Sequence, residues 1–417
     1  MTSDKQTAKP LYVYIQRPDT CEWITVGRYL NLSGTNGSYR YAPTYVAAGH
    51  RWNIDPVNLR LLPGVEFPAP RYGGLHDVLR DACPDAWGKS LIAKKDGISL
   101  NAPDIDFLLR SGNSDRWGAL AVGNSKTPNV NHLSSPKLTQ LHDLVIELLA
   151  ISENRDPVYP VLRKKLFASA SSGGARPKFT VQDGETHWLV KPGIATDTVD
   201  LALLEHVSQL LGKRSGLSFA DTVHHPIDSG KSVVRIRRFD RNGAKRILCV
   251  SAASLLQVTY PPLTKEDVTG ASYPRLADTL KAIGAPPGDR IELFGRMVFN
   301  VVIGNDDDHA RNHAITYDDE IKSWKLSPAF DVVPNPEENP NELAMQICTG
   351  SRIISRENIV SDFLRFGFES KNQCEINLEN LLQNILAAFT EIGPTLSPSL
   401  KGLMEQRLKE NISKLSV

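Results

Sequence analysis

Residues 300–317 read NVVIGNDDDHARNHAITY, a stretch in which an apolar segment gives way to a run of polar side chains. The apolar residues before Gly304 predict the end of a helix there, because glycine is favoured just past the last helical turn. Of the eight residues 305–312, six carry acidic, amide or imidazole side chains. Folding alone does not require this density of reactive groups in one loop. We therefore expect the segment to carry the chemistry of the protein.

Two residues of this loop, Asp307 and Asn312, have the spacing of a kinase catalytic loop. There, a base Asp is followed five residues later by an Asn that binds Mg²⁺. Asp306 and Asp308 each miss this spacing by one residue. A metal-hydrolase site made of these acids and His309 is the less favoured alternative, because contiguous acids rarely converge on one ion without distant ligands.

A second candidate ligand is Asp331, which ends the segment LSPAFD after a short apolar strand. In kinases an Asp at this place binds Mg²⁺ beside the β- and γ-phosphates. Val332 and Val333 follow it instead of the usual Phe-Gly. A turn residue before Pro334 is the alternative role for Asp331.

Upstream, the segment HWLVKP predicts a strand that carries Lys191, and Glu205 follows in a helix with an apolar periodicity. This order fits the Lys–Glu ion pair of kinases. A solvated strand-edge charge and a surface helix residue are the alternatives. The segment SSGGARPKF, residues 171–179, precedes the strand. Its glycines and cations suit a phosphate loop, although a plain hairpin turn has the same pattern.

The composition excludes several classes of protein. Lys and Arg number 48 against 47 Asp and Glu, so the formal net charge is only +1, and bulk electrostatics cannot hold nucleic acid or an anionic membrane. The five cysteines are far apart, which argues against disulfide frameworks and Cys-rich zinc sites. No signal peptide or membrane-spanning run is evident. We expect a cytoplasmic protein without a membrane partner.

The chain divides into three expected parts. Residues 1–135 form a β-rich N-terminal subdomain that includes helical turns over 75–94, broken at Pro84, and a polar linker over 123–136. Residues 136–245 alternate strand, helix and strand. In residues 246–417 helical stripes take over and strands are expected nearly to vanish. The fold class is thus α+β, with a β-rich lobe followed by a helical lobe.

Five blocks in this order, SSGGARPK, WLVKP with Glu205, RRFDR, NDDDHARN and LSPAFD, resemble the HipA family of bacterial serine/threonine kinases. The segment LRDACPDAWGK is similar to the N-terminal subdomain of that family. The resemblance implies a two-lobed protein-kinase-like fold with an additional N-terminal subdomain. It runs from about residue 11 to residue 400.

The resemblance also implies roles for individual residues. Asp307 would be the catalytic base, supported by Lys191 and Glu205, while Asn312 and Asp331 would bind Mg²⁺. Ser171, or its neighbour Ser172, would be autophosphorylated. The residues implied to bind ATP are Gly173, Gly174, Ala175, Arg176, Pro177, Lys178, Lys191, Arg237, Arg238, Phe239, His309, Ala310, Arg311, Asn312, Phe330 and Asp331.

By resemblance the chain would be the toxin of a toxin–antitoxin pair. It would use ATP and Mg²⁺ to phosphorylate a cytoplasmic protein and arrest growth, an aminoacyl-tRNA synthetase being one candidate substrate, and autophosphorylation at Ser171 would switch it off. Its partner would be a HipB-like helix-turn-helix antitoxin, through which it would reach DNA. The alternatives are a small-molecule or lipid kinase, and a non-catalytic member of a repressor complex.

Overall fold

The computed structural model describes residues 10–32, 36–131, 135–168, 174–227 and 231–416. The chain forms two compact units, one of residues 1–190 and 240–250, the other of residues 191–239 and 251–417. Each unit combines helices and strands, so the fold is α+β, as expected. The division into three parts at residues 135 and 245 stays a prediction.

The first unit contains an antiparallel five-stranded sheet in the order β4-β3-β2-β1-β5. Aromatic and β-branched side chains fill its inner face, and Val13, Ile15 and Tyr39 have no measurable exposure. Such residues pack well on a half-buried pleated surface. The strands are β1 (Leu11–Gln16), β2 (Trp23–Asn31), β3 (Gly37–Tyr41), β4 (Glu66–Ala69) and β5 (Leu120–Gly123).

Helices and two hairpins complete the first unit. Pro84 lies between α2 and α3, so the helical stretch is broken where its sequence predicts. The hairpins are β6 (Phe179–Asp183) with β7 (Thr186–Pro192), and β10 (Arg241–Asn242) with β11 (Lys245–Arg246); β12 (Cys249–Ser251) follows. The helices are α1 (Pro43–Ala47), α2 (Asp77–Asp81), α3 (Ala86–Asp96), α4 (Asp104–Arg110), α5 (Leu141–Ser152) and α6 (Pro160–Ala168), with 3-10 turns η1 (Tyr72–Gly74) and η2 (Leu138–Gln140).

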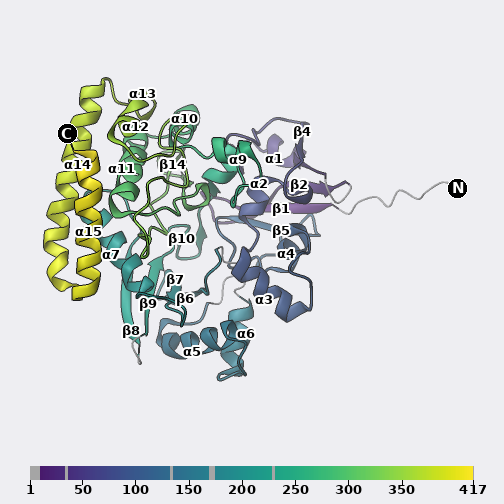
Figure 1. Ribbon diagram of the computed structural model, residues 1–417. Helices are drawn as coiled ribbons and strands as arrows, with labels where there is room; N and C mark the ends of the chain where they lie inside the picture. Colours follow the sequence, from purple (N-terminus) through teal and green to yellow (C-terminus); the bar gives the residue numbers. More distant parts are fainter. Residues whose placement is uncertain (1–9, 33–35, 132–134, 169–173, 228–230, 417) are drawn as a thin grey trace. The chain divides into compact units, whose positions relative to one another are not determined.

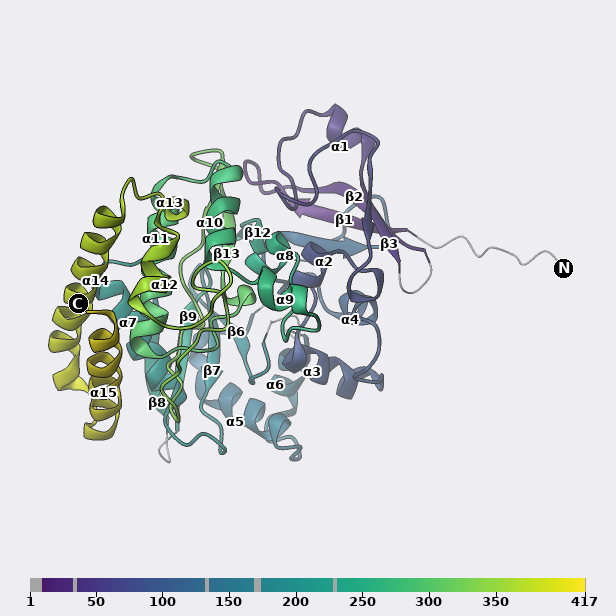
Figure 2. The ribbon, with the colours of Figure 1, turned by 45° about the horizontal axis from the view of Figure 1, so that its top comes forward.

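The second unit is built around α11 (Gly288–Ile303), which packs against α10 (Tyr273–Ala282) and α15 (Pro398–Leu415). Helix α14 (Lys371–Ile392) packs against α7 (Leu201–Arg214), and Figures 1 and 2 show α14 and α15 running side by side. The remaining elements are the hairpin of β8 (Thr222–Ile227) and β9 (Lys231–Arg237), helices α8 (Ala252–Leu256), α9 (Lys265–Gly270), α12 (Arg356–Ser361) and α13 (Phe363–Phe366), and 3-10 turns η4 (Ala310–Asn312) and η5 (Gly393–Thr395).

Two short strands lie after residue 251 in the described part of the chain. β13 (Ala314–Asp318) pairs antiparallel with β14 (Ser323–Leu326), and Trp324 and Leu326 alternate into the core. Strands this short carry little periodicity, which is why the sequence pattern does not predict β13. The hairpin is important because it lies between the two loops that hold the candidate site.

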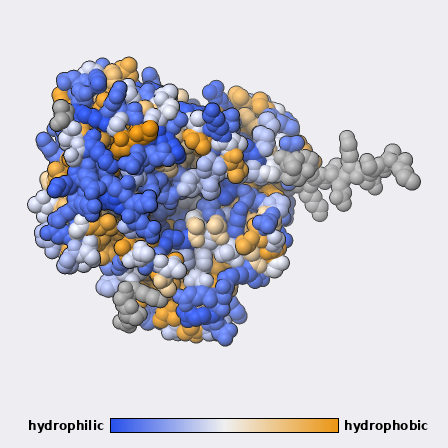
Figure 3. Space-filling model, in the orientation of Figure 1, coloured by the Kyte–Doolittle hydropathy of each residue, from blue (hydrophilic) through white to orange (hydrophobic). Residues whose placement is uncertain are grey.

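Hydrophilic residues cover much of the face drawn in Figure 3, with hydrophobic residues in scattered patches among them. Within the part of the chain that the structure describes, no helix combines the length and the apolar character needed to cross a membrane.

Candidate active site

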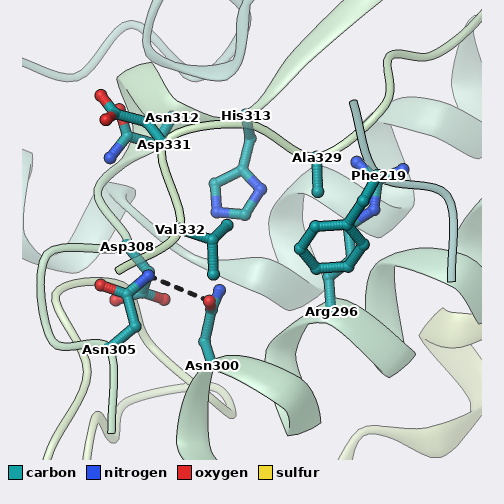
Figure 4. Close-up of a pocket in the computed structure, with 10 residues that line it drawn as sticks. All are labelled: Phe219, Arg296, Asn300, Asn305, Asp308, Asn312, His313, Ala329, Asp331 and Val332. Atoms are coloured by element: carbon teal, nitrogen blue, oxygen red, sulfur yellow. Dashed lines mark hydrogen bonds between the residues drawn. The ribbon is translucent and has the colours of Figure 1, made fainter. Parts of the chain in front are cut away.

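Helix α11 leads the chain into the loop of acidic residues. Its apolar side chains from Leu293 onward, among them Met297 and Val301, are fully buried, and it ends at Gly304, whose backbone is left-handed with φ 74°. Glycine adopts this conformation without a steric penalty, so the helix stops here. The side-chain amide of Asn305 then donates to Asn300 Oδ1 at 3.0 Å, which fastens the start of the loop to the helix (Figure 4).

The three consecutive aspartates of the loop have different environments. Asp306 accepts a hydrogen bond from the side chain of Asn335 at 2.9 Å. Asp308 is buried and accepts from the hydroxyl of Tyr273 at 2.6 Å. The side chain of Asp307 is 66% exposed. Asp307 therefore offers the most accessible carboxylate of the three, while the other two are engaged in holding the loop.

Asp308 ties the loop to its surroundings. It also accepts from the backbone N–H of Ala344 at 2.8 Å, and Asn300 donates to the hydroxyl of Tyr273 at 2.9 Å. Burial raises the pKa of Asp308 to about 7, although its hydrogen bonds from Tyr273 and the backbone act in the opposite direction. The carboxyl group of Asp308 thus has a structural position in the loop.

Asn312 lies in the short turn η4 and reaches back to the loop. Its backbone N–H donates to the carbonyl of His309 at 2.8 Å. Its side-chain nitrogen donates to the carbonyl oxygen of Asp307 at 2.9 Å, which leaves the amide oxygen directed away from that bond. An amide oxygen is a suitable ligand for a hard cation such as Mg²⁺.

Asp331 lies in the second loop, after β14, with a left-handed backbone at φ 59°. Asp is one of the few residues besides glycine that tolerate this conformation. Together with Asn312 it lines a small cavity of about 10 Å³, roughly the space of one water molecule (Figure 4). The remaining residues that line it are Phe219, Arg296, Asn300, Asn305, Asp308, His313, Ala329 and Val332.

Lys191 lies between two carboxylates. Its Nζ is 2.7 Å from Oε1 of Glu205 on α7 and 2.5 Å from Oδ1 of Asp331. Burial alone would lower the pKa of Lys191, but the charges of Asp331 and Glu205 and their hydrogen bonds raise it above its ordinary value. The amine therefore stays cationic, and the ion pairs join α7, the strand residue and the Asp331 loop.

The other residues implied to bind ATP, outside the glycine-containing loop, lie in the same unit. The rings of Phe239 and Phe330 are 5.2 Å apart between centroids. Arg237 is exposed and forms an ion pair with Asp221 at 3.4 Å. Arg238, Ala310 and Arg311 are described as well, and Ala310 is buried. The structure thus brings Lys191, Glu205, Asp307, Asn312, Asp331 and the two phenylalanines into one unit.

The expected phosphate loop belongs to the other unit. Ser171, Ser172 and Gly173 lie outside the described residues. Gly174 donates its N–H to Asp85 at 2.8 Å, and Trp87 donates its backbone N–H to the Gly174 carbonyl at 3.1 Å.

Gly174 is therefore fastened to the residues that begin α3. Gly174 has φ 87°, and a Cβ there would lie 2.2 Å from Lys178 Nζ, so the backbone favours glycine. Of the other loop residues, Ala175 is exposed, Arg176 is partly exposed, and Pro177 and Lys178 are buried.

The sequence pattern did not reveal the contact of Tyr260 with the loop. The Tyr260 hydroxyl donates to Asp307 Oδ1 at 2.6 Å, and its ring lies 3.7 Å from that of His309 between centroids. Burial lowers the pKa of His309, while the charge of Asp307 acts to raise it. Tyr260 and Tyr273 have no motif around them, and only the tertiary structure brings them to the loop.

Comparison with known proteins gives three findings. The sequence model of the protein family described as "HipA-like C-terminal domain" matches residues 170–391 of this chain. A protein of Sinorhizobium fredii named "Putative kinase Y4mE" is 31% identical over 115 residues, which are 26% of this chain and 26% of that protein. The match thus spans about a quarter of that curated relative.

The third finding is a likeness to solved structures. The HipA, HipB and operator DNA complex of Shewanella oneidensis MR-1 contains a chain that matches with a TM-score of 0.69 and 15% identity, over 97% of both chains. The Helicobacter pylori proinflammatory kinase CtkA matches with a TM-score of 0.44 and 18% identity, over 58% of this chain and 90% of that one. The first likeness confirms the expected α+β kinase-like fold with its additional N-terminal part.

Proposed function

Because the chain belongs to the HipA family, we propose that it is a protein kinase that transfers the γ-phosphoryl group of ATP to a serine or threonine hydroxyl. The observation that supports this most is the pairing of Lys191 with Glu205 and Asp331 in the unit that also holds Asp307 and Asn312. Kinases need a phosphate-binding Lys fixed by a Glu, a metal-binding Asp, and a base followed by an Asn.

The oxygen ligands fit Mg²⁺. Asp331 offers a partly exposed carboxylate, and Asn312 offers an amide oxygen because its nitrogen is bound to the Asp307 carbonyl. Mg²⁺ is usually held by one or two protein oxygens together with substrate phosphates. No group of three His, Cys, Asp or Glu residues suited to a metal is found among the described residues, and this mode of binding does not need one. Bound Mg²⁺ would neutralise charge on the phosphates.

The protein residues have separable tasks. Asp307 would accept the proton of the attacking hydroxyl, because its carboxylate is accessible and its backbone is held by Asn312 and by Asn305. Lys191 would bind phosphate oxygens while Glu205 keeps the amine in place. Catalysis would come mainly from positioning and charge stabilisation. The role of residues 173–178 at the phosphates rests on the resemblance alone.

The resemblance supports the wider biological role that we propose. The chain would be a toxin that acts on a cytoplasmic protein, with an aminoacyl-tRNA synthetase as a candidate, and its kinase activity would be switched off by autophosphorylation at Ser171. A HipB-like antitoxin would be its partner, since the similar Shewanella oneidensis chain is part of a complex with HipB and operator DNA. Copurification with the product of a neighbouring helix-turn-helix gene, and operator binding only with that partner, would test the assembly.

The acceptor class can be tested directly. The purified protein is incubated with γ-³²P-labelled ATP, Mg²⁺ and one of three acceptors: dephosphorylated casein, a bacterial lipid extract or a metabolite extract. We expect label on protein, recovered as phosphoserine or phosphothreonine, and no label when EDTA removes Mg²⁺. Label confined to the lipid or metabolite fraction would contradict the proposal.

A further inference from the structure

The hydroxyl of Tyr260 occupies a hydrogen-bonding position on the candidate base. It donates to Asp307 Oδ1 at 2.6 Å, the separation at which a general base takes a proton from its substrate. Burial, and then the hydrogen bond to Asp307, raise the pKa of Tyr260 above its ordinary value, so the phenol stays protonated and remains a donor. The base is thus already paired with an O–H group of this chain.

The ring of Tyr260 makes a second contact with the loop. It lies against the ring of His309, and His309 Nε2 is 3.8 Å from the same Asp307 oxygen. Yet Tyr260 is itself 37% exposed. The phenol therefore lies at the surface, where it contacts Asp307 through one hydrogen bond and His309 through its ring.

The segment that carries Tyr260 is anchored at both of its ends. Asp267 is buried and accepts from the backbone N–H groups of Thr259 at 2.6 Å and Leu263 at 3.1 Å. These hydrogen bonds lower the pKa of Asp267, although its burial alone would raise it. Residues 260–263 are exposed, and Leu263 is 80% exposed. The anchors therefore hold the backbone of an exposed segment that carries Tyr260.

We propose that Tyr260 is a specificity-determining residue whose hydroxyl holds the place of the acceptor hydroxyl at Asp307 and is displaced by the substrate. The inference rests on the proposed kinase function. An acceptor must compete with the phenol for Asp307 Oδ1 and with the ring for the space above His309. An acceptor that makes further contacts with the protein, in addition to its hydroxyl group, displaces the phenol more readily. Water and small alcohols lack such contacts and displace it poorly. Tyr260 thereby limits futile hydrolysis of ATP.

The test compares wild type with Tyr260→Phe, which keeps the ring and removes the hydroxyl, and Tyr260→Ala, which removes both. Tyr317→Phe is the control, because Tyr317 lies against Trp324 in the β13–β14 hairpin. Initial rates are measured with dephosphorylated casein and, separately, with water as the acceptor. Asp307→Asn supplies the background rate. Thermal unfolding of each variant verifies that it is folded.

We expect Tyr260→Phe to lower the KM for casein by about tenfold, in line with the loss of one hydrogen bond to a charged group, and to leave the KM for ATP unchanged. Tyr260→Ala should also raise the rate of ATP hydrolysis. A KM for casein that is unchanged or higher in Tyr260→Phe, or a kcat that falls, would show that the phenol supports the base and would overturn the inference. Phosphate on Tyr260 in wild type would also overturn it, because the residue would then be an acceptor.

The kinase proposal itself can fail in a distinguishable way. Wild type would then transfer no phosphate above the Asp307→Asn background to casein or to water. The proposed role of Tyr260 would be rejected together with the kinase function. If wild type is active and only the expected Tyr260 effects are missing, the kinase proposal stands and the role of Tyr260 is rejected.

Discussion

Lys191 Nζ lies 2.7 Å from Glu205 Oε1, and both side chains are almost completely withdrawn from solvent. A buried ion pair is weak evidence for stability, because desolvation offsets much of the attraction between its charges. Removing one partner is costly, since the other charge stays buried after its counter-charge is lost. A variant that removes both charges should therefore keep more stability than one that removes Lys191 alone, and the comparison separates the structural role of Lys191 from its role in catalysis.

Lys191→Ala is expected to abolish phosphoryl transfer and to lower the free energy of unfolding by about 3 kcal/mol, because Glu205 is left as a buried charge. Lys191→Arg should lose less transfer activity and less stability than Lys191→Ala, although the guanidinium of arginine is not equivalent to the amine of lysine. Urea unfolding and transfer assays measure the two effects. The double variant Lys191→Ala, Glu205→Gln should regain stability without activity. Full activity of Lys191→Ala would show that Lys191 has only a structural role and does not bind the phosphates.

Asp331→Asn and Asn312→Ala should each weaken the binding of ATP with Mg²⁺, because each changes one oxygen ligand of a hard cation. Asn tolerates the left-handed backbone of residue 331, so that variant removes charge without adding strain. Thermal unfolding with and without ATP and Mg²⁺ measures binding, since a ligand stabilises the folded state it binds. The metal role is wrong if both variants gain as much stability from ATP and Mg²⁺ as wild type.

The stability conferred by Asp308 should depend on pH. Its folded pKa is about 7, raised by burial above the unfolded value of 3.8. Its contribution is therefore fully present below pH 4 and is lost as the pH rises toward and through 7. Asp308→Asn removes this titration, so its stability relative to wild type should rise by up to roughly 1.4 kcal/mol per pH unit across that window. Urea unfolding at pH 5, 6 and 7 measures the difference, and a constant difference would contradict the prediction.

Ser171 or Ser172 should become phosphorylated by the protein itself and thereby inactivate it. A phosphoserine carries about −1.5 to −2 charges at pH 7, and it would compete with the phosphates of ATP for a loop that carries Arg176 and Lys178. Mass spectrometry of peptide 169–178 after incubation with ATP tests this in wild type and Asp307→Asn. Equal phosphate in both proteins, or none in an active wild type, would reject self-inactivation.

Much of the candidate site follows from local sequence. Lys191 and Glu205 belong to a strand and an apolar-periodic helix, and the motif order predicts their pairing. The spacing to Asn312 selects Asp307 from the three aspartates, and the structure adds that Asp307 is the most exposed of them. These residues lie close together in the sequence or belong to regular helices and strands, so a sequence pattern can predict them.

Other features depend on contacts between distant segments. The hydrogen bonds of Asp308 with Tyr273 and of Asp307 with Tyr260 join residues 35 and 47 positions apart. No periodicity encodes such pairs. The strand β13 is missed for a different reason, since five residues beside a polar loop are too few to show alternation.

The proposed mechanism needs Asp307 as the base, and this role is measured by the initial rate of phosphoryl transfer from ATP to casein. Asp306→Asn is the matched control, because Asp306 lies one residue away and bonds to Asn335. We expect Asp307→Asn to lower kcat by about 10²- to 10⁴-fold, the usual contribution of a general base, while Asp306→Asn stays near the wild-type rate. A wild-type rate in Asp307→Asn, or an equal loss in both variants, would contradict it.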